Sequence, residues 1–244
     1  MIVIATASSL HYAGRHSQEV SVMTSSSRAS MIRSAAALFG SRGLCGTSFS
    51  DVLADSGAPR GSIYHHFPGG KTQLAQDAIG WTSEQVLAHL RASPGGTASD
   101  VLAWFIDLWR QSVLASGGLA GCPVAGVALD TGAAAADLID AARDAFSSWT
   151  AVLSGQLQAA GVPAHRAGPI ATTALAGMEG ALILCRAERS SQPLEATARE
   201  LMHLLPLRPA HGPLRRCADL RSRPCHSSGQ AALAIDMAEI VPPR

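Results

Sequence analysis

The sequence has 244 residues, of which 47% are hydrophobic and 15% are charged. This composition excludes an intrinsically disordered chain and a highly charged coiled coil, and the length suits one domain or a small domain joined to a larger one. The formal net charge of +1 hides an asymmetry, because residues 24–75 carry five basic side chains and only two acidic ones.

The hydropathy pattern and the cysteines predict the compartment. No apolar run reaches the roughly 18 residues that a membrane-spanning helix requires, because Asp130, Asp137 and Asp140 interrupt the most apolar stretch. No basic residue precedes the apolar N-terminus, as it would in a signal peptide. The five cysteines include no Cys-x-x-Cys pair, which argues against a disulfide framework and a zinc module. We therefore expect a cytoplasmic protein with no membrane partner, no cofactor and no bound metal.

The two ends of the chain differ from its middle. Residues 1–23 lack helical periodicity and are predicted to be a disordered or non-native extension, with Met23 as the hypothetical native start. Residues 206–244 are rich in proline and arginine and are predicted to be a disordered basic tail. From about residue 26 to about residue 205, apolar residues recur at helical spacing, and no segment shows sustained strand alternation. This pattern predicts an all-α fold of roughly nine helices.

The first two helices are marked by their ends. The first is predicted over Arg28–Arg42, with Gly43 ending it. Ser48 and Asp51 then form a capping box, in which the serine side chain caps backbone N–H groups and the carboxylate reaches back. This box starts a short second helix, which stops at Gly57 in a tight turn.

A third helix is predicted to begin at Pro59, where the missing N–H of proline costs nothing. Two short helices joined by a glycine turn make a helix-turn-helix, whose second helix faces DNA. Ile63 and Phe67 are four residues apart and are predicted to anchor that helix inward. The side chains left to point outward are Arg60, Ser62, Tyr64, His65 and His66. They are hydrogen-bonding or aromatic, and no carboxylate lies between residues 56 and 76 to repel phosphate.

Two neighbouring positions extend this predicted surface. Gly61 has no side chain, so the backbone can approach a partner closely. Lys71 opens the next helix, where a cation and free backbone N–H groups can bind a phosphate together. The adjacent His65 and His66 are less suited to a metal site, because neighbouring residues of a helix point in different directions.

This region contains three motifs in which particular residue types stand at fixed spacing. They are Ala36-x2-Phe39-x3-Gly43, Gly46-Thr47-Ser48-Phe49-x2-Val52 and Ser56-Gly57-Ala58-Pro59-x-Gly61-Ser62-Ile63-Tyr64-His65-His66-Phe67. Over about 50 residues, roughly a fifth of the chain, the sequence resembles the tetracycline-repressor (TetR) family of transcriptional regulators. Phe67-Pro68-Gly69-Gly70-Lys71-x2-Leu74 and Gly121-Cys122-Pro123-Val124-Ala125 resemble the branch of lincomycin-resistance and flavonoid-responsive repressors.

The resemblance implies a symmetric dimer, with a DNA-binding domain (24–70) and a larger ligand-binding and dimerisation domain (71–205) in each subunit. By position, the family's major-groove contacts fall on Arg60, Gly61, Ser62, Tyr64, His65 and His66. Its phosphate contacts fall on Thr47, Ser48 and Lys71, and we add Arg28, in the first helix, to the DNA-binding candidates. Two such heads would bind palindromic DNA with half-sites about one helical turn or more apart.

Aromatic residues gather in the predicted larger domain. The candidates for an apolar pocket between its helices are Trp81, Trp104, Phe105, Trp109, Phe146, Trp149, Met178 and Leu182. Helical bundles place ligands in such positions, so we expect a small hydrophobic or aromatic effector. For any single one of these residues, packing in a core is the better interpretation.

Two further stripes are candidates for a homodimer interface. Small residues follow one helix face at Ala167, Ala171, Ala174, Gly177, Met178, Ala181 and Cys185, and a second apolar stripe consists of Leu194, Ala198, Leu201 and Leu205. Together they suit a four-helix interface between two subunits. Packing within one chain would give the same pattern.

The sequence thus predicts a repressor that binds operator DNA as a dimer and leaves it when an effector binds. No buried acid or base stands out, and the motifs for dinucleotide binding, zinc proteolysis and hydrolase chemistry are absent, so we do not expect an enzyme. Two alternatives stay open. One is an all-helical small-molecule-binding enzyme or carrier with an incidental helix-turn-helix, and the other is a DNA-binding protein that activates or needs no ligand.

Overall fold

The computed structural model describes residues 27–131 and 135–205, and every regular element in these ranges is a helix. The first helix is described over residues 27–42. It is followed by α2 (Phe49–Ser56), α3 (Ser62–His66), α4 (Gly70–Arg91), α5 (Ala98–Ala115), α6 (Pro123–Asp130), α7 (Ala136–Ala159), α8 (Ala164–Glu188) and α9 (Gln192–His203). Within the described ranges the all-α prediction and the expected nine helices are confirmed. The predictions for residues 1–23 and 206–244 lie outside these ranges.

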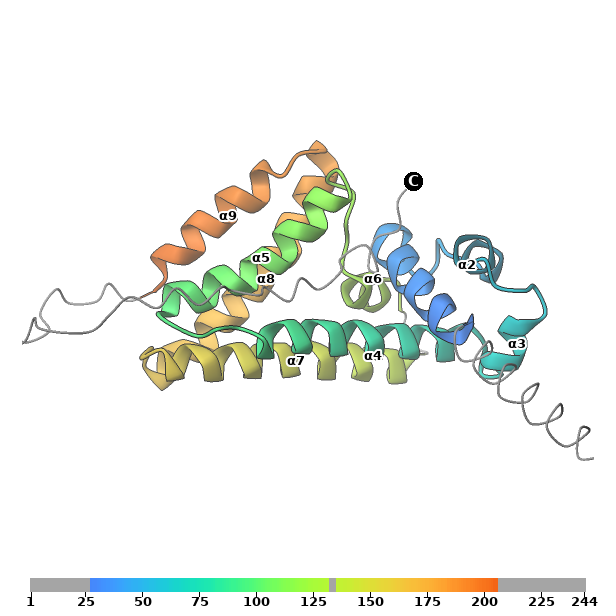
Figure 1. The fold of residues 1–244 in the computed structure, drawn as a ribbon, viewed down its shortest axis with the longest axis horizontal. Helices are drawn as coiled ribbons and strands as arrows, with labels where there is room; N and C mark the ends of the chain where they lie inside the picture. Colours follow the sequence, from blue (N-terminus) through green and yellow to red (C-terminus); the bar gives the residue numbers. More distant parts are fainter. Residues whose placement is uncertain (1–26, 132–134, 206–244) are drawn as a thin grey trace, which may run out of the picture.

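The helices form a small head and a larger body (Figure 1). The head consists of the helix over residues 27–42 together with α2 and α3. The 22-residue helix α4 begins at the head and then packs along α7 in the body. In the body, α8 packs against both α7 and α9, and α5 contacts all three of them. Helix α4 therefore connects the head to the body.

The ends of α2 follow the local signals in the sequence. The backbone N–H of Asp51 donates to Ser48 Oγ over 3.2 Å, and the backbone N–H of Ser48 donates to Asp51 Oδ2 over 2.7 Å. Gly57 ends α2 in the left-handed conformation, with φ of 66°, which a residue without a Cβ adopts at no steric cost. The predicted capping box and glycine stop are both confirmed.

The third helix begins later than predicted. It starts at Ser62, not at Pro59, because Pro59 lies in a turn that precedes the helix. The Pro59 carbonyl accepts hydrogen bonds from the Ser62 backbone N–H over 2.9 Å and from Ser62 Oγ over 2.6 Å. These two bonds close the turn and leave α3 only five residues long.

The expectation that no apolar run is long enough to cross a membrane is wrong for α8, the one described helix that is long and apolar enough by length and composition alone. In the structure, 44% of its most apolar 18-residue window is buried by the rest of the protein. The core helix of a folded domain passes the same test of length and composition.

The two stripes proposed for a dimer interface face inward. Ala171, Ala174 and Met178 are fully buried within the single chain, and so is Leu194 on α9. At Gly177 an added Cβ would lie 3.1 Å from a methyl group of Thr197 on α9. The stripes therefore bring α8 close to its neighbours within one protomer, and the interface assigned to them is corrected.

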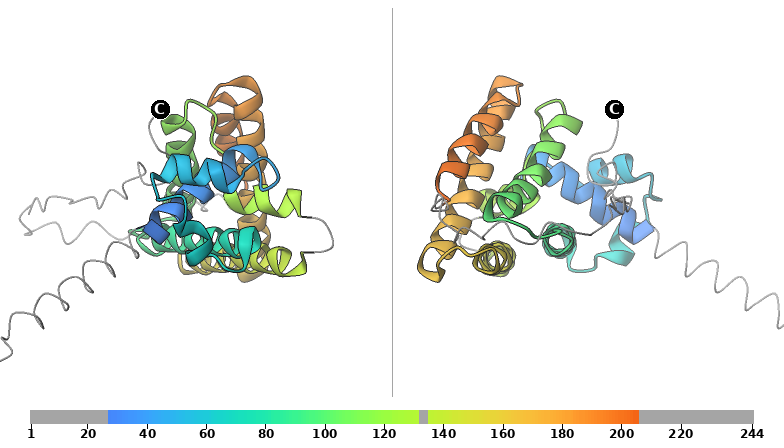
Figure 2. Two further views of the ribbon diagram at one scale, coloured as in Figure 1. Left: turned by 90° about the vertical axis from the view of Figure 1, so that its right-hand side faces the viewer. Right: turned by 60° about the vertical axis from the view of Figure 1, so that its left-hand side comes forward.

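The outer face of α8 has a different composition. Ile183 and Leu184 are 63% and 51% exposed, and Ala176 and Gly180 lie on the same exposed side. Figure 2 (right) shows α8 and α9 side by side at one edge of the described helices. This apolar face is without a partner inside the described part of the chain.

Candidate nucleic-acid interface and effector region

Helix α3 is held in the head by two apolar anchors. Ile63 and Phe67 are fully buried, as their spacing predicts. The opposite side presents Arg60, Gly61, Tyr64 and His65 as exposed residues, whereas Ser62 and His66 are half-buried. The head therefore shows a continuous polar and aromatic face whose members come from one short segment.

Tyr64 and Gly61 on this face make few contacts with the rest of the chain. Tyr64 is 69% exposed and contacts only the edge of the Phe49 ring among the described aromatic residues, with ring centroids 5.7 Å apart. Gly61 has φ of −78°, and an added Cβ would meet no atom within 4 Å. Neither the backbone conformation nor the space inside the chain requires glycine here, so the missing side chain leaves room for something outside the chain.

The histidines of α3 lie in different environments. The ring centroids of His65 and His66 are 5.3 Å apart. Burial lowers the pKa of His66 below its ordinary value, and the nearby charges of His65 and Arg28 lower it further. Among the described residues, no group of three or more histidine, cysteine or acidic side chains is arranged to hold a metal ion.

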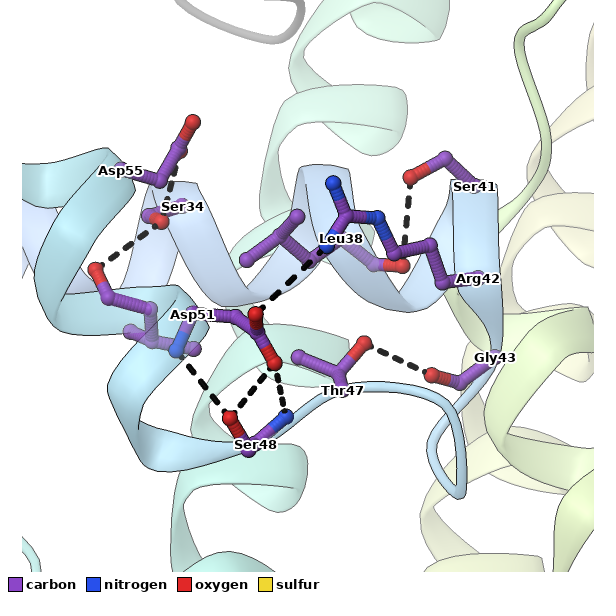
Figure 3. Close-up of polar contacts among 10 residues, drawn as sticks. Ser34, Leu38, Ser41, Arg42, Gly43, Thr47, Ser48, Asp51 and Asp55 are labelled. Carbon is purple, nitrogen blue, oxygen red and sulfur yellow. Dashed lines mark hydrogen bonds and ion pairs between the residues drawn. The ribbon is translucent and has the colours of Figure 1, made fainter.

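The acidic side chains of the helix-turn-helix are all engaged by neighbours (Figure 3). Asp51 Oδ1 lies 3.7 Å from Arg42, and hydrogen bonds from Ser48 hold the pKa of Asp51 below its ordinary value. Asp55 Oδ2 accepts a hydrogen bond of 2.7 Å from Ser34 Oγ, which joins α2 to the helix over residues 27–42. These bonds keep both carboxylates occupied on the α2 side of the head.

Two of the residues that were predicted to contact DNA form bonds within the protein. Thr47 is 1% exposed, and its hydroxyl donates to the Gly43 carbonyl over 2.8 Å, so its side chain is not available at the surface. Arg28 forms an ion pair of 2.6 Å with Asp77 on α4 and lies over the Phe67 ring. Thr47 is therefore an internal residue of the head, whereas Arg28 stays partly exposed and links the head to α4.

The other two predicted phosphate contacts lie at helix starts. Ser48 is exposed at the N-terminus of α2. Lys71 is half-buried in the first turn of α4, and no ion pair engages it among the described residues. Backbone N–H groups in the first turns of α2 and α4 are suited to an anion, and Lys71 adds a cation at the second of them. The Ser48 side chain is already engaged, because its hydroxyl donates to Asp51 Oδ2 over 2.5 Å.

Part of the predicted effector group forms one aromatic cluster. Phe105, Trp109, Phe146 and Trp149 are linked in edge-to-face contacts, with centroid distances of 5.3–6.4 Å. Trp149 Nε1 donates to Ser83 Oγ on α4 over 3.1 Å, whereas Trp109 Nε1 is buried and has no partner among the described residues. The cluster is therefore packed as core and is bonded to the helix that leads to the head.

The remaining predicted effector residues are dispersed. Trp104 stacks on His89, with ring centroids 4.7 Å apart, and its Nε1 donates to the His89 carbonyl. Trp81 is half-buried against the core, while Met178 and Leu182 on α8 are buried.

Two cavities lie at the end of the body farthest from the head. They have volumes of about 190 and 710 Å³. Both are lined by Gly96, Ala159 and Ala160, and by none of the predicted aromatic residues.

Glu179 is a residue that sequence reasoning missed. Burial raises its pKa to about 7, although a hydrogen bond with the Cys122 side chain acts in the opposite direction. Its Oε1 is buried and has no partner in the part of the chain that the structure describes. Burial also raises the pKa of the Cys122 thiol. The expectation that no buried acid stands out is therefore wrong. The signal was present, because Glu179 is the single charged residue between Arg166 and Arg186 in an otherwise apolar and small-residue helix.

Comparison with known proteins gives a consistent result over both parts of the chain. Residues 31–78 match the family described as bacterial regulatory proteins of the tetR family, and residues 98–200 match the C-terminal domain of LmrA/YxaF-like transcriptional regulators. A Mycobacterium tuberculosis protein named as an uncharacterised HTH-type transcriptional regulator is 39% identical over 73% of this chain and 93% of its own length. The HTH-type transcriptional regulator LmrA of Bacillus subtilis is 32% identical over 69% of this chain and 90% of its own.

Solved structures agree with this fold. A TetR transcriptional regulator from Chloroflexus aurantiacus is 28% identical, with a TM-score of 0.62 over 74% of this chain and 94% of that one. The regulator CifR, in complex with a 26-base-pair double-strand operator DNA, is 19% identical, with a TM-score of 0.58 over 72% of this chain and 95% of its own.

Proposed function

This chain belongs to the TetR family of transcriptional regulators, and we propose that it is a repressor that binds palindromic operator DNA as a homodimer and is released by a small hydrophobic or aromatic effector. The observation that carries the DNA-binding part is the exposed face of the segment from Arg60 to His66. Its groups are left largely unused by the fold, and Gly61 leaves open space beside them.

Operator contacts are assigned to this face. Arg60, Tyr64 and His65 reach base edges and phosphates from α3 and the turn before it, and Gly61 allows the DNA backbone to come close. Backbone N–H groups at the start of α2, next to Ser48, and Lys71 at the start of α4 bind flanking phosphates. The structure of CifR, a protein of the same fold, in complex with operator DNA supports DNA binding by this fold.

The dimer is assigned to the outer face of α8. Ile183 and Leu184 are exposed apolar residues, and the nearby Ala176 and Gly180 allow a second helix to approach closely. A two-fold axis at this face would place one head on each side. Two heads on one palindrome bind more tightly than one, because the second contact is intramolecular.

The effector is assigned to the aromatic cluster of Phe105, Trp109, Phe146 and Trp149. An apolar or aromatic molecule that enters there has to part the rings, and the bond from Trp149 to Ser83 transmits this movement to α4. Helix α4 begins at the head, so its displacement changes the separation of the two recognition helices. A coupling of about 1 to 3 kcal/mol would change operator affinity about 5- to 150-fold.

The test begins with an operator obtained by selection from a random-sequence duplex library with the full-length protein. Fluorescence anisotropy then compares that duplex with a scrambled one at two salt concentrations, because phosphate contacts alone fade with salt and ignore sequence. We expect a palindromic sequence, two chains per duplex and a strong preference over the scrambled duplex. Selection that yields no common sequence would overturn the proposal.

Arg60→Ala tests the recognition face directly. Loss of a base-contacting arginine costs about 1 to 3 kcal/mol, or about 5- to 150-fold in affinity for the selected duplex. The matched control is Arg91→Ala, which removes the same charge at the far end of α4, about 30 Å from its first residue. If Arg60→Ala binds as tightly as the parent while Arg91→Ala does so too, α3 is not the recognition element.

A further inference from the structure

The head meets the body at a junction built from bare backbone. Gly40, near the end of the helix over residues 27–42, lies against Gly121, and a Cβ on either residue would collide with the carbonyl of the other. A Cβ on Gly126 in α6 would collide with the Phe39 carbonyl. These three glycines let backbone touch backbone at this point, while elsewhere the buried apolar residues of head and body form one continuous core.

Two charged side chains of the body reach across this junction. Asp130, the last residue of α6, accepts a hydrogen bond from the Cys45 backbone N–H, with Oδ2 and N 2.9 Å apart. Arg186 on α8 donates to the carbonyls of Ser41 and Gly40. The acid thus binds a free N–H in the loop, and the base binds free carbonyls at a helix C-terminus, where the partial charge is negative.

Arg186 binds the last turn of the helix over residues 27–42, and Asp130 binds the loop that follows this helix. Figure 1 shows α3 at the end of the head that lies away from α6, so a small rotation at the junction becomes a larger displacement of α3. Arg186 is also only two residues from Leu184, on the helix to which the dimer contact is assigned. Helix α8 would therefore carry both the proposed dimer contact and the contact of Arg186 with the head.

We propose that Asp130 and Arg186 are positioning residues that set the angle of the head on the body, and thereby the half-site spacing that the dimer accepts. This inference rests on the proposed function. Both side chains belong to exposed residues, and exposed charged contacts contribute little to folding stability. Truncation of either side chain leaves the protein folded and widens the range of angles between the head and the body.

The experiment measures spacing selectivity in the full-length protein. The duplex selected by the parent is compared with versions in which one central base pair is inserted or removed, which changes the half-site separation by about 3.4 Å and rotates it by about 34°. The measured quantity is the ratio of affinities for the selected and the altered duplexes. A loss of folded protein lowers the apparent binding to all duplexes equally and leaves this ratio unchanged.

We expect Arg186→Ala and Asp130→Ala each to reduce the ratio about fivefold or more, the lower end of couplings between distant sites. The control Arg199→Ala removes an exposed arginine from α9 and keeps the parent ratio. An unchanged ratio in either folded variant overturns the role of that residue. If the parent itself shows no preferred duplex, the proposed function fails, and this outcome is distinct from a failure of the junction residues alone.

Discussion

The recognition face and the head–body junction both combine glycine with charged side chains, yet they differ in what those groups contact. At the junction, Gly126 lies against the Phe39 carbonyl, and Asp130 and Arg186 bind backbone atoms of the head. On the recognition face, Gly61 is surrounded by open space. At the junction, glycine allows close contact with another segment of the same chain. On the recognition face, Gly61 leaves space for a molecule outside the chain.

The comparison also separates two uses of polar groups. A polar group that is satisfied inside the protein fixes a geometry, whereas one that is exposed and unpaired is free to exchange water for a ligand. Single substitutions in one region at a time separate the consequences for folding from those for DNA binding.

The largest effect is expected from the buried acid beside the junction. The pKa of Glu179 is raised from 4.5 to about 7 in the folded protein. Between pH 4.5 and pH 7 the folded state holds more of this proton than the unfolded state does. The contribution of Glu179 to the free energy of unfolding is therefore fully present below pH 4.5 and is lost as the pH rises through 7. Glu179→Gln removes this ionisation, and we expect it to abolish about 2 to 3 kcal/mol of the stability loss between pH 5 and pH 8.

Urea unfolding at fixed protein concentration and several pH values measures this effect. Glu188→Gln, which changes an exposed carboxyl near the end of the same helix, is expected to follow the parent at every pH. Parallel pH profiles for the parent and Glu179→Gln would contradict the buried, proton-holding state of Glu179.

A smaller effect is expected at the junction glycine. Gly126→Ala places a Cβ against the Phe39 carbonyl and should destabilise the fold by about 1 to 3 kcal/mol, as overpacking does. Gly155→Ala on α7 meets no atom within 4 Å and should stabilise the fold by about 0.5 to 1 kcal/mol, because alanine favours a helix. Thermal unfolding of the two variants should thus shift in opposite directions. A shift of the same sign in both would remove the steric argument for the junction.

The smallest change in stability is expected on the recognition face. Gly61→Ala has space for its methyl group and a negative φ, so its free energy of unfolding should stay within about 0.5 kcal/mol of the parent. Affinity for the selected duplex should fall about tenfold if a DNA backbone occupies that space. Anisotropy and urea unfolding on the same sample give both values. Full affinity in this variant would mean that DNA does not approach Gly61 closely.

The sequence predicted those elements whose signals lie within a few residues. The capping box was identified because Ser48 and Asp51 are three residues apart, and the Gly57 stop because a glycine ends the short helix. Ile63 and Phe67 were placed inward on helical spacing alone. The motifs of the helix-turn-helix were therefore enough to predict the head and the family.

The same reasoning could not predict contacts between segments that lie far apart in the sequence. The pairing of Arg28 with Asp77 joins residues 49 positions apart, and Thr47 is buried by elements that come together only in the folded head. The small-residue face of α8 illustrates the point, since the sequence fits an interface within one chain or between two. Only packing against α7 and α9 decided between them.

The sequence by itself thus determined the helices, their caps and the outward chemistry of α3, because hydrogen bonds and side-chain periodicity within a turn or two depend on neighbouring residues. The tertiary structure decided which face of α8 is free, that Glu179 is enclosed beside Cys122, and that Asp130 and Arg186 reach the head. Burial and long-range polar contacts depend on which segments meet in space, and that is settled only when the whole core packs.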